Sequence, residues 1–593
     1  MKYLKLFVLV ASTGLLIDSC SKPYLNKRPL GQLDETSLAN KKGVEGLLIG
    51  AYSLLDGIGG NKSSFFSAAS NWTYGSICGS EGYTGSNDGD GARDVALPLE
   101  KFSPLPTNVP LADKWGTVYD GVQRANEVLR VMAKAKDISP EDQKRMAAES
   151  RFLRAFYHFE AKKIWNKIPF IDETITYENG NYHVSNEKDT WPNIENDLQY
   201  AMANLVATPY QGAVGRATKY TAMAMLAKAY MFQKKFPEAK TLLDTIISSG
   251  VFELVSYHDN FNPETKNSKE SVFSAQMSVN DGAEGMNGNF GDVLNFPDGF
   301  LFGMQPGLCC GFFLPSQYLV NHFKTDGITG LPDLDNFNTG DVTNDEGIES
   351  TDPFTPYPGT VDPRLDWTVG RRGIPYLDWG IHPGKIWIRN QDLNGPYSPK
   401  KNSYYKSQEG RLTDASFWST GATANNVNLI RYADVLLWAA EVELEIGSLD
   451  KAEDYINMIR SRAANRSGWV HTYIDPNDPS KGFTNDPAAN YFINTYPVGY
   501  FTAHGQDHAR KAIRYERMLE LSMEGHRFFD LVRWGIAETE INTYLQKEQN
   551  PRRYLNNASF TKNKNEYFPI PQTQIDLSAG ADGISKMKQN PGF

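Results

Sequence analysis

Residues 217–248 read ATKYTAMAMLAKAYMFQKKFPEAKTLLDTIIS, and this stretch decides the fold. Ala227 and Ala239 fall at the two small-residue positions of a tetratricopeptide repeat, while Leu243 and Ile246 fall at positions that larger apolar side chains fill. Small residues let two antiparallel helices approach closely, and the larger ones occupy the groove between them. The stretch therefore predicts a helical hairpin of tetratricopeptide type.

A second segment fits the same frame. Residues 433–464 read ADVLLWAAEVELEIGSLDKAEDYINMIRSRAA, with Ala440 and Ala452 at the small-residue positions and Gly447-Ser448 as the turn. Two matches in one frame predict a mostly α-helical protein with a tetratricopeptide-like superhelix as its scaffold.

Four further segments show helical periodicity. They are Thr36–Ile58, Trp115–Leu129, Ser139–Trp165 and His508–Trp534. Ser139 followed by Pro140 is a strong helix start, because serine caps the first turn and proline suits its first position. Residues 59–112 are rich in Gly, Ser, Asn and Pro and predict irregular structure.

The repeats are separated by a large loop-rich insertion. Residues 255–430 contain many Gly and Pro and few helical periods. We therefore expect one domain from residue 20 to 593, in which 36–250 form the N-terminal helical part and 431–535 the second repeat and final helix. Residues 536–593 are expected to be an extended tail. The length alone, 593 residues, would allow four independent domains, but the shared repeat frame favours one integrated array.

Composition and charge exclude several classes of protein. Hydrophobic residues make up 40% and charged residues 22%, with 31 Phe, 30 Tyr and 11 Trp, which excludes a disordered chain and a coiled coil. The formal net charge is −10 and there is no basic stripe, so nucleic acid is excluded as a partner.

The N-terminus has the form of an export signal. Lys2 and Lys5 precede the apolar run Leu6–Ile17, which is too short to span a membrane. The following residues, Leu16–Cys20, resemble a bacterial lipobox, although Asp18 departs from its tightest form. We predict that residues 1–19 are a lipoprotein signal peptide and that Cys20 is acylated, anchoring the protein to a membrane. A plain secretory signal is the alternative.

No catalytic residues are predicted. Glu520 and Glu524 lie one helical turn apart and could in principle share a proton. Arg517, Arg527 and Arg533 lie at spacings that pair with them, so a structural ion network is favoured. The sequence has no phosphate-binding loop and no nucleophile elbow, and we expect no cofactor.

No metal site is predicted either. His504 and His508 lie four apart, but Gly505 stands where a zinc protease needs glutamate. The acidic stretches 87–91 and 333–346 lack the layout of a calcium loop and are expected to be solvated loops. The neighbours Cys309 and Cys310 could be a disulfide or two thiols, and the sequence leaves their redox state open.

Aromatic side chains in the loops are the candidates for ligand binding. Flat rings flanked by amides and carboxylates suit sugars, whose rings have apolar faces and polar rims. Trp72 lies in a stretch, residues 71–77, that alternates like a buried strand, whereas Tyr83 lies among Gly, Ser, Asn and Asp, which favours exposure. The candidate ligand-binding residues are Trp72, Tyr83, Asp88, Phe300, Phe302, Phe312 and Trp379.

Several motifs, taken in order, resemble the SusD/RagB family of outer-membrane lipoproteins. The matching segments are Arg151–Tyr157, Trp165–Pro169, Gly215–Thr218, Asp362–Leu365, Ile430–Leu437, Glu520–Gly535, Phe568–Pro571 and Gln589–Phe593. The resemblance implies a SusD-like fold and a cell-surface lipoprotein of the outer membrane. It also implies capture of a glycan ligand and its delivery to a SusC-like TonB-dependent transporter as partner.

Two other functions remain open at this point. The protein could bind peptides for uptake, as some members of this family are thought to do. An anchored glycoside hydrolase would carry similar aromatic loops, but it needs two carboxylates at a fixed separation in a cleft. A non-enzymatic glycan-binding protein is the function that the sequence favours.

Overall fold

A computed structural model describes residues 35–59, 65–299, 303–307, 309–416 and 419–593. Cys20, Phe300 and Phe302 lie outside this range. In the residues that the structure covers, no helix is both long and apolar enough to cross a bilayer.

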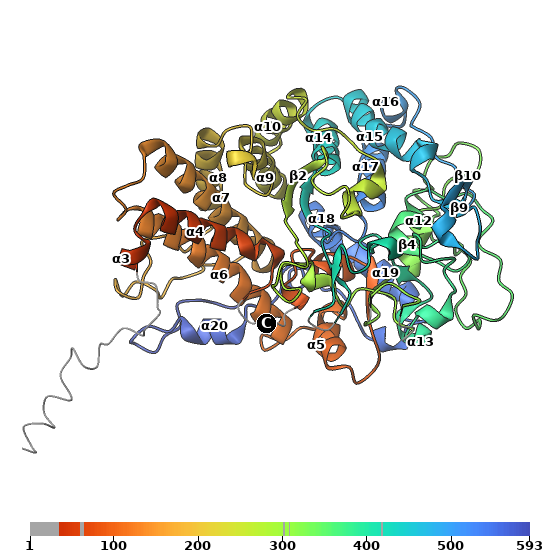
Figure 1. The fold of residues 1–593 in the computed structure, drawn as a ribbon, viewed down its shortest axis with the longest axis horizontal. Coiled ribbons are helices and arrows are strands. Elements are labelled where there is room, and N and C mark those ends of the chain that lie inside the picture. Colours follow the sequence, from red (N-terminus) through yellow and green to blue (C-terminus); the bar gives the residue numbers. More distant parts are fainter. Residues whose placement is uncertain (1–34, 60–64, 300–302, 308, 417–418) are drawn as a thin grey trace, which may run out of the picture.

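A continuous array of helices forms the scaffold (Figure 1). Each helix packs against the next in chain order, and the array confirms the predicted mostly α-helical, tetratricopeptide-like fold. Its members are α4 (Lys41–Tyr52), α6 (Val109–Met132), α7 (Pro140–Trp165), α8 (Trp191–Asn204), α9 (Lys219–Phe232), α10 (Phe236–Ser248), α14 (Tyr432–Ile446), α15 (Leu449–Ala464) and α17 (Gln506–Leu521).

The two predicted repeats are the hairpins α9–α10 and α14–α15. Ala227, Ala239, Ala440 and Ala452 are all completely buried, which confirms their role as small residues between packed helices. Ser448 caps α15 by accepting a hydrogen bond from the Lys451 amide, as the predicted turn requires. Because α10 packs directly on α14, the two repeats are neighbours although the insertion separates them along the chain.

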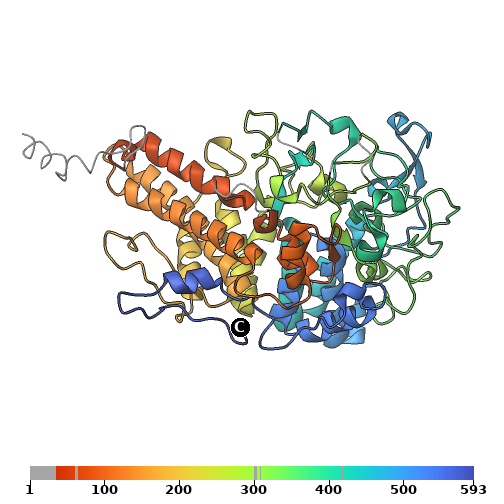
Figure 2. The same cartoon turned by 90° about the horizontal axis from the view of Figure 1, so that it is seen from below.

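The two ends of the loop-rich insertion join the helical array at the same place. Strand β2 (Ser271–Ala275) pairs antiparallel with β8 (Val427–Arg431), so the two ends of the insertion lie side by side. Figure 2 shows its yellow-green and green loops along one edge and one end of the molecule. The insertion also contains β3 (Phe312–Pro315), α11 (Gln317–His322), α12 (Leu365–Thr368), β4 (Val369–Gly370), α13 (Gln391–Asn394), β5 (Ser398–Pro399), β6 (Thr413–Asp414) and β7 (Ala422–Thr423).

One predicted helix start is correct and another is not. Ser139 accepts a hydrogen bond from the Asp142 amide (3.2 Å) at the start of α7, as predicted. The helix expected over 36–58 is instead divided into α3 (Glu35–Leu38) and α4, because the side chain of Asn40 caps α4.

The prediction of one helix over 508–534 is wrong. The chain leaves α17 at Leu521, turns, and resumes as α18 (Arg527–Trp534). Met523 and Gly525 have φ values of 61° and 77°, which interrupt the helix. At Gly525 a Cβ atom would lie 2.0 Å from the carbonyl oxygen of Ser70. The absence of a side chain therefore lets the turn pack directly against the distant segment that contains Ser70.

Two loop predictions also need correction. The tail contains α19 (Ala537–Glu548) and α20 (Gln572–Leu577), and α19 buries Ile541, Tyr544 and Leu545 at helical spacing. Residues 59–112 contain α5 (Gly91–Glu100), which Asp90 caps. The stretch expected to be a buried strand is η3 (Trp72–Ile77), a turn of π-helix whose residues are all buried.

The part of the tail around residues 568–571 is extended and packs against α7. The Phe568 amide donates to the Ile164 carbonyl (3.0 Å), and the Trp165 indole donates to the Pro569 carbonyl (3.1 Å). Strand β9 (His471–Tyr473) pairs with β10 (Phe483–Pro487), and the short helix α16 (Tyr500–His504) follows them.

A buried ion cluster joins the helical array to the insertion. Glu520 of α17 forms ion pairs with Arg364 (2.9 Å), Arg431 (2.5 Å) and Arg462, and all four side chains are at most 8% exposed. The connected groups are five carboxylates (Glu270, Asp362, Glu516, Glu520, Glu524) and five cations (Arg364, Lys401, Arg431, Arg460, Arg462). Equal numbers of each charge make this burial tolerable.

The cluster confirms the predicted structural role of Glu520 and Glu524, but with other partners. Glu524 pairs with Arg431 (2.9 Å) and Lys401 (2.6 Å). Burial raises the pKa of Glu520, but the guanidinium groups of Arg462, Arg431 and Arg364 outweigh it and hold that pKa well below its ordinary value. Glu520 is therefore ionised at neutral pH and has no proton to donate.

We expect Glu520→Gln to lower the free energy of unfolding at pH 7 by about 3–5 kcal/mol, because it leaves buried arginines without a counter-charge. Since the folded-state pKa is lowered, this stabilisation is full above the ordinary value of 4.5 and declines progressively as the pH falls from there through the lowered folded-state pKa. Denaturant unfolding of both proteins at pH 7 and pH 3.5 measures this. An equal difference in the free energy of unfolding at the two pH values would contradict this prediction. As a control, Glu187→Gln, which lies in an exposed ion pair, should change the free energy of unfolding little.

Two glycines of α6 give a matched test of helix packing. A Cβ atom on Gly121 would lie 2.6 Å from the ring of the buried Tyr157, whereas one on Gly116 would meet nothing within 4 Å. Gly121→Ala should cost about 1–3 kcal/mol through overpacking. Gly116→Ala should stabilise the helix by about 0.5–1 kcal/mol. Thermal unfolding would show opposite shifts, and similar shifts would contradict the packing of α6 on α7.

Candidate ligand-binding face

Two loops that the sequence singled out are brought together by a short strand pair. Strand β1 (Gly82–Gly85) pairs antiparallel with β3, and Gly85 lies opposite Phe312. The pairing continues one step further, because the Ser86 amide donates to the Gly311 carbonyl (2.7 Å). The loop after β1 therefore lies beside Cys309 and Cys310, which precede β3.

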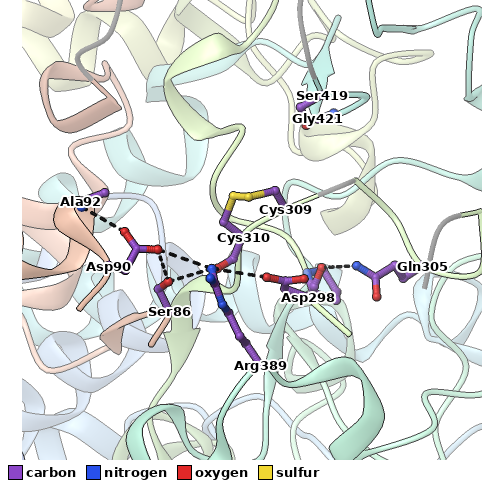
Figure 3. The surroundings of a disulfide bond; sticks show 11 residues. Ser86, Asp90, Ala92, Asp298, Gln305, Cys309, Cys310, Arg389, Ser419 and Gly421 are labelled. Carbon is purple, nitrogen blue, oxygen red and sulfur yellow. Dashed lines mark hydrogen bonds and ion pairs between the residues drawn. A yellow bond between two sulfur atoms is a disulfide. The ribbon is translucent and has the colours of Figure 1, made fainter. Parts of the chain in front are cut away.

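Arg389 lies at the centre of this region (Figure 3). Its Nη1 donates to the Ser86 hydroxyl (2.9 Å) and forms ion pairs with Asp90 (3.4 Å) and Asp298 (3.6 Å). Asp298 is completely buried, whereas the side chains of Asp90 and Arg389 are about one-fifth exposed. One guanidinium thus joins three separate loops, and we call the surface around it the Arg389 face.

The neighbours Cys309 and Cys310 form a disulfide beside Arg389 (Figure 3). Cys310 is buried and its carbonyl accepts from Arg389 Nη1 (3.4 Å). The backbone around the pair is fixed by the Cys310 amide, which donates to the Leu294 carbonyl (3.1 Å).

Carboxylates form the rim of the Arg389 face. Asp90 accepts from the Ser86 hydroxyl (2.6 Å) and from the Ala92 amide (3.0 Å). Asp88 is 78% exposed and forms an ion pair with Arg93 (3.3 Å). Charged acceptors and donors at a surface can bind sugar hydroxyls strongly, because hydrogen bonds to charged groups are stronger than neutral ones.

The predicted aromatic residues lie below this face. Trp72 and Phe312 contact each other edge-on, with ring centroids 6.2 Å apart, and each is 1% exposed. The Trp72 indole donates to the Phe65 carbonyl (3.1 Å). Neither ring offers a free face to a sugar in this structure, so they support the loops from within.

The expectation that Tyr83 is exposed is wrong. Its strand is buried by the pairing of β1 with β3, and the hydroxyl donates to Glu548 Oε2 (2.6 Å) while Arg552 lies over the ring. Burial raises the pKa of Glu548, and the Tyr83 hydroxyl is its hydrogen-bond donor there. Tyr83 therefore fixes α19 beneath the face.

Trp379 lies in a second, smaller core. It is 8% exposed and its indole donates to the Tyr404 carbonyl (2.8 Å). The other members of this core are Phe296, Tyr376, Leu377, Trp387 and Tyr404. Asp88 is thus the candidate residue that the structure places at the surface, while Phe300 and Phe302 lie outside the described residues.

A small hollow lies beside the loops of the face, and the sequence did not reveal it. Its volume is about 20 Å³, which is room for about one water molecule. Asn289, Asn295 and Asn402 line it together with Lys401 and Ser403. These asparagines are scattered along the chain and follow no period, so no sequence signal could have grouped them.

The described residues offer no metal centre. Within the ranges given above, no three His, Cys, Asp or Glu side chains come close enough to hold a metal ion. His504 and His508 lie near one another, with ring centroids 5.0 Å apart, but the Nδ1 atom of His504 is bonded to the Tyr500 carbonyl (2.8 Å).

Comparisons with known proteins agree with the fold. The family model described as "SusD family" matches residues 269–593, and one described as "Starch-binding associating with outer membrane" matches residues 97–231. A SusD-like protein of Formosa agariphila is 26% identical over 436 residues, which cover 72% of this chain and 70% of that protein.

Solved structures are similar along almost the whole chain. A SusD superfamily protein from Bacteroides vulgatus has a TM-score of 0.64 at 20% identity, covering 94% of this chain and 99% of that one. Surface glycan-binding protein A from Bacteroides thetaiotaomicron, in complex with laminarihexaose, has a TM-score of 0.63 at 19% identity, covering 93% and 99%. Because the first family model spans more than half of the chain, including the motifs at 362–365, 430–437 and 520–535, this protein belongs to the SusD family, as its motifs predicted.

Proposed function

We propose that this protein is a surface lipoprotein that binds glycans without hydrolysing them and delivers them to a SusC-like TonB-dependent transporter. Membership of the SusD family supports glycan binding, since a protein of the same fold has been solved with laminarihexaose. The observation that carries the proposal for this chain is the convergence of three loops on Arg389.

The chemistry of the Arg389 face suits a sugar. Asp88, Asp90 and Arg389 supply exposed or partly exposed charged groups that hydrogen-bond to hydroxyls. The loops below them are fixed by Trp72 and Phe312, so the polar groups are held in place before the ligand arrives. A preorganised surface loses less entropy on binding than a mobile one.

The affinity should be modest. The hollow beside the face holds about one water molecule, so a ligand would keep much of its surface in solvent. A dissociation constant on the order of micromolar to millimolar, or about −8 to −4 kcal/mol, fits such an open surface. Weak binding also suits a protein that must release its ligand to a transporter.

Anchoring and delivery complete the proposal. Acylation of Cys20 would hold the protein at the outer membrane, and the family model described as outer-membrane-associated supports that location. The helical array offers a broad surface on which a transporter could dock, as repeat arrays commonly do.

A glycan-binding assay with matched variants tests the ligand proposal. Asp88→Asn and Arg389→Gln should weaken binding about threefold to tenfold, since each removes a charged hydrogen-bonding group. Glu187→Gln, in an exposed ion pair elsewhere, should bind with unchanged affinity. Affinity electrophoresis in laminarin and other polysaccharide gels provides the measurement. Release of reducing ends would contradict the non-enzymatic role, and a blank glycan array with co-purifying peptides would favour peptide uptake.

Membrane attachment has its own test. Cys20→Ser should move the protein from the membrane fraction to the soluble fraction, because it removes the acylated thiol. Cys78→Ala is the matched control, since Cys78 is buried and unpaired, and this variant should stay with the membrane. Unchanged fractionation of Cys20→Ser would contradict acylation at this position.

A further inference from the structure

A large open groove lies away from the Arg389 face, at the end of the molecule where α16 is found (Figure 1). Its volume is about 1010 Å³, and none of its lining residues belongs to the Arg389 face. Sites for drug-sized ligands occupy about 300–1,000 Å³, so the groove has room for an oligosaccharide. It is formed by the loop 324–336, Tyr357, and the segment 494–508.

The walls of the groove are rich in groups that bind hydroxyls. Asp326, Asp333 and Asp335 supply carboxylates, and Asn494 and Thr495 supply an amide and a hydroxyl. Carboxylates and amides both accept hydrogen bonds, and the amide and hydroxyl also donate them. This mixture matches the polar rim of a sugar ring.

The groove also has aromatic surface. Tyr357 and Tyr500 are partly buried, so each leaves part of its ring or hydroxyl accessible from the groove. Tyr496 is 3% exposed, yet its hydroxyl has no hydrogen-bond partner among the described residues. His508 also lines the groove, and its buried Nε2 atom likewise has no hydrogen-bond partner among the described residues. Buried polar atoms without a partner are rare in folded proteins and mark places where a further partner is expected.

Charge restricts the class of ligand. Asp335 is paired with Lys511, and the two remaining aspartates, Asp326 and Asp333, outnumber Lys324, the one lysine in the lining. Burial lowers the pKa of His508, which leaves it neutral at pH 7. An acidic wall repels carboxylated or sulfated glycans and accepts uncharged ones.

The aspartates are not arranged for a cation. Asp326 accepts hydrogen bonds from the backbone amides of Ile328 (3.1 Å) and Thr329 (2.7 Å). Asp333 accepts one from the backbone amide of Asn336 (2.9 Å). Asp335 forms an ion pair with Lys511. The carboxylates are thus oriented by the loop itself and offer their remaining acceptor positions to a ligand.

We propose that this groove is a second carbohydrate-binding site, which takes a neutral oligosaccharide. It goes beyond the function proposed for the Arg389 face, because it lies on other loops and would let one chain hold two glycan segments at once. Two linked weak sites would retain a long polysaccharide more firmly than either one alone.

Equilibrium dialysis with the mature chain tests this proposal. The probes are the neutral hexaoses of the laminarin, cellulose, starch, xylan and mannan series, with tri-galacturonate as the anionic comparison. At least one hexaose should bind at two molecules per chain, and tri-galacturonate should be excluded from the groove. Tyr500→Ala should weaken one of the two sites about tenfold, since ring stacking is lost. Tyr357→Ala is a second variant in case Tyr500 is needed for folding.

Three further variants separate the two sites. Arg389→Gln should weaken binding at the Arg389 face and leave the groove site unchanged. The tyrosine variants should do the reverse, so the loss of either site can be told from the loss of the other. Asp333→Asn keeps an acceptor for the Asn336 amide but removes charge, and it should admit tri-galacturonate more readily. Glu187→Gln, in an exposed pair elsewhere, should change neither site. One bound hexaose that Tyr500→Ala weakens and Arg389→Gln leaves intact would support the groove site and contradict the Arg389-face site. No binding of any hexaose, or binding that both tyrosine variants leave unaltered, would overturn the proposal of the groove site.

Discussion

The structure depends on one buried set of charges. The single carboxylate of Glu520 forms ion pairs with three arginines. Arg364 directly precedes α12, Arg431 ends β8, and Arg462 lies in α15. A partly formed ion cluster is unfavourable, because a buried ion without its partner raises the free energy of the folded state by several kcal/mol. The helical array and the insertion are therefore required to fold in one relative position.

The same cluster reaches toward the candidate face. Lys401, its only lysine, donates to Glu524 (2.6 Å) and to the Ser522 carbonyl (2.8 Å), and it also lines the hollow beside the face. The turn that carries Glu524 touches Ser70 through Gly525, and Ser70 lines the same hollow. A chain of direct contacts thus connects the scaffold to the loops from which we propose that glycan is bound.

The sequence predicted what is local. The small alanines of both repeats, the cap at Ser139 and the turn at Gly447-Ser448 act between neighbours in the chain, so periodicity and residue type were sufficient to find them. The break after Leu521 was missed because its cause, the close approach of Ser70 to Gly525, lies far away in the sequence.

The candidate site shows the same limit. Tyr83 has the neighbours of an exposed loop residue, but its partner Glu548 is 465 positions away and was not visible to a local pattern. The Arg389 face and the groove near α16 each combine polar residues from segments that share no period. Sequence motifs could therefore name the family, whereas only the packed structure shows which side chains of the candidate loops reach the surface.

Hydrogen exchange of Lys401→Met tests most directly the claim that the ion cluster couples scaffold and ligand loops. The substitution removes one charge of the cluster from the loop side while keeping an unbranched side chain. We predict faster amide exchange both in residues 289–296 of the loops and in β2 and β8 at the scaffold, because they share the cluster. Faster exchange confined to residues 399–403 would contradict the account.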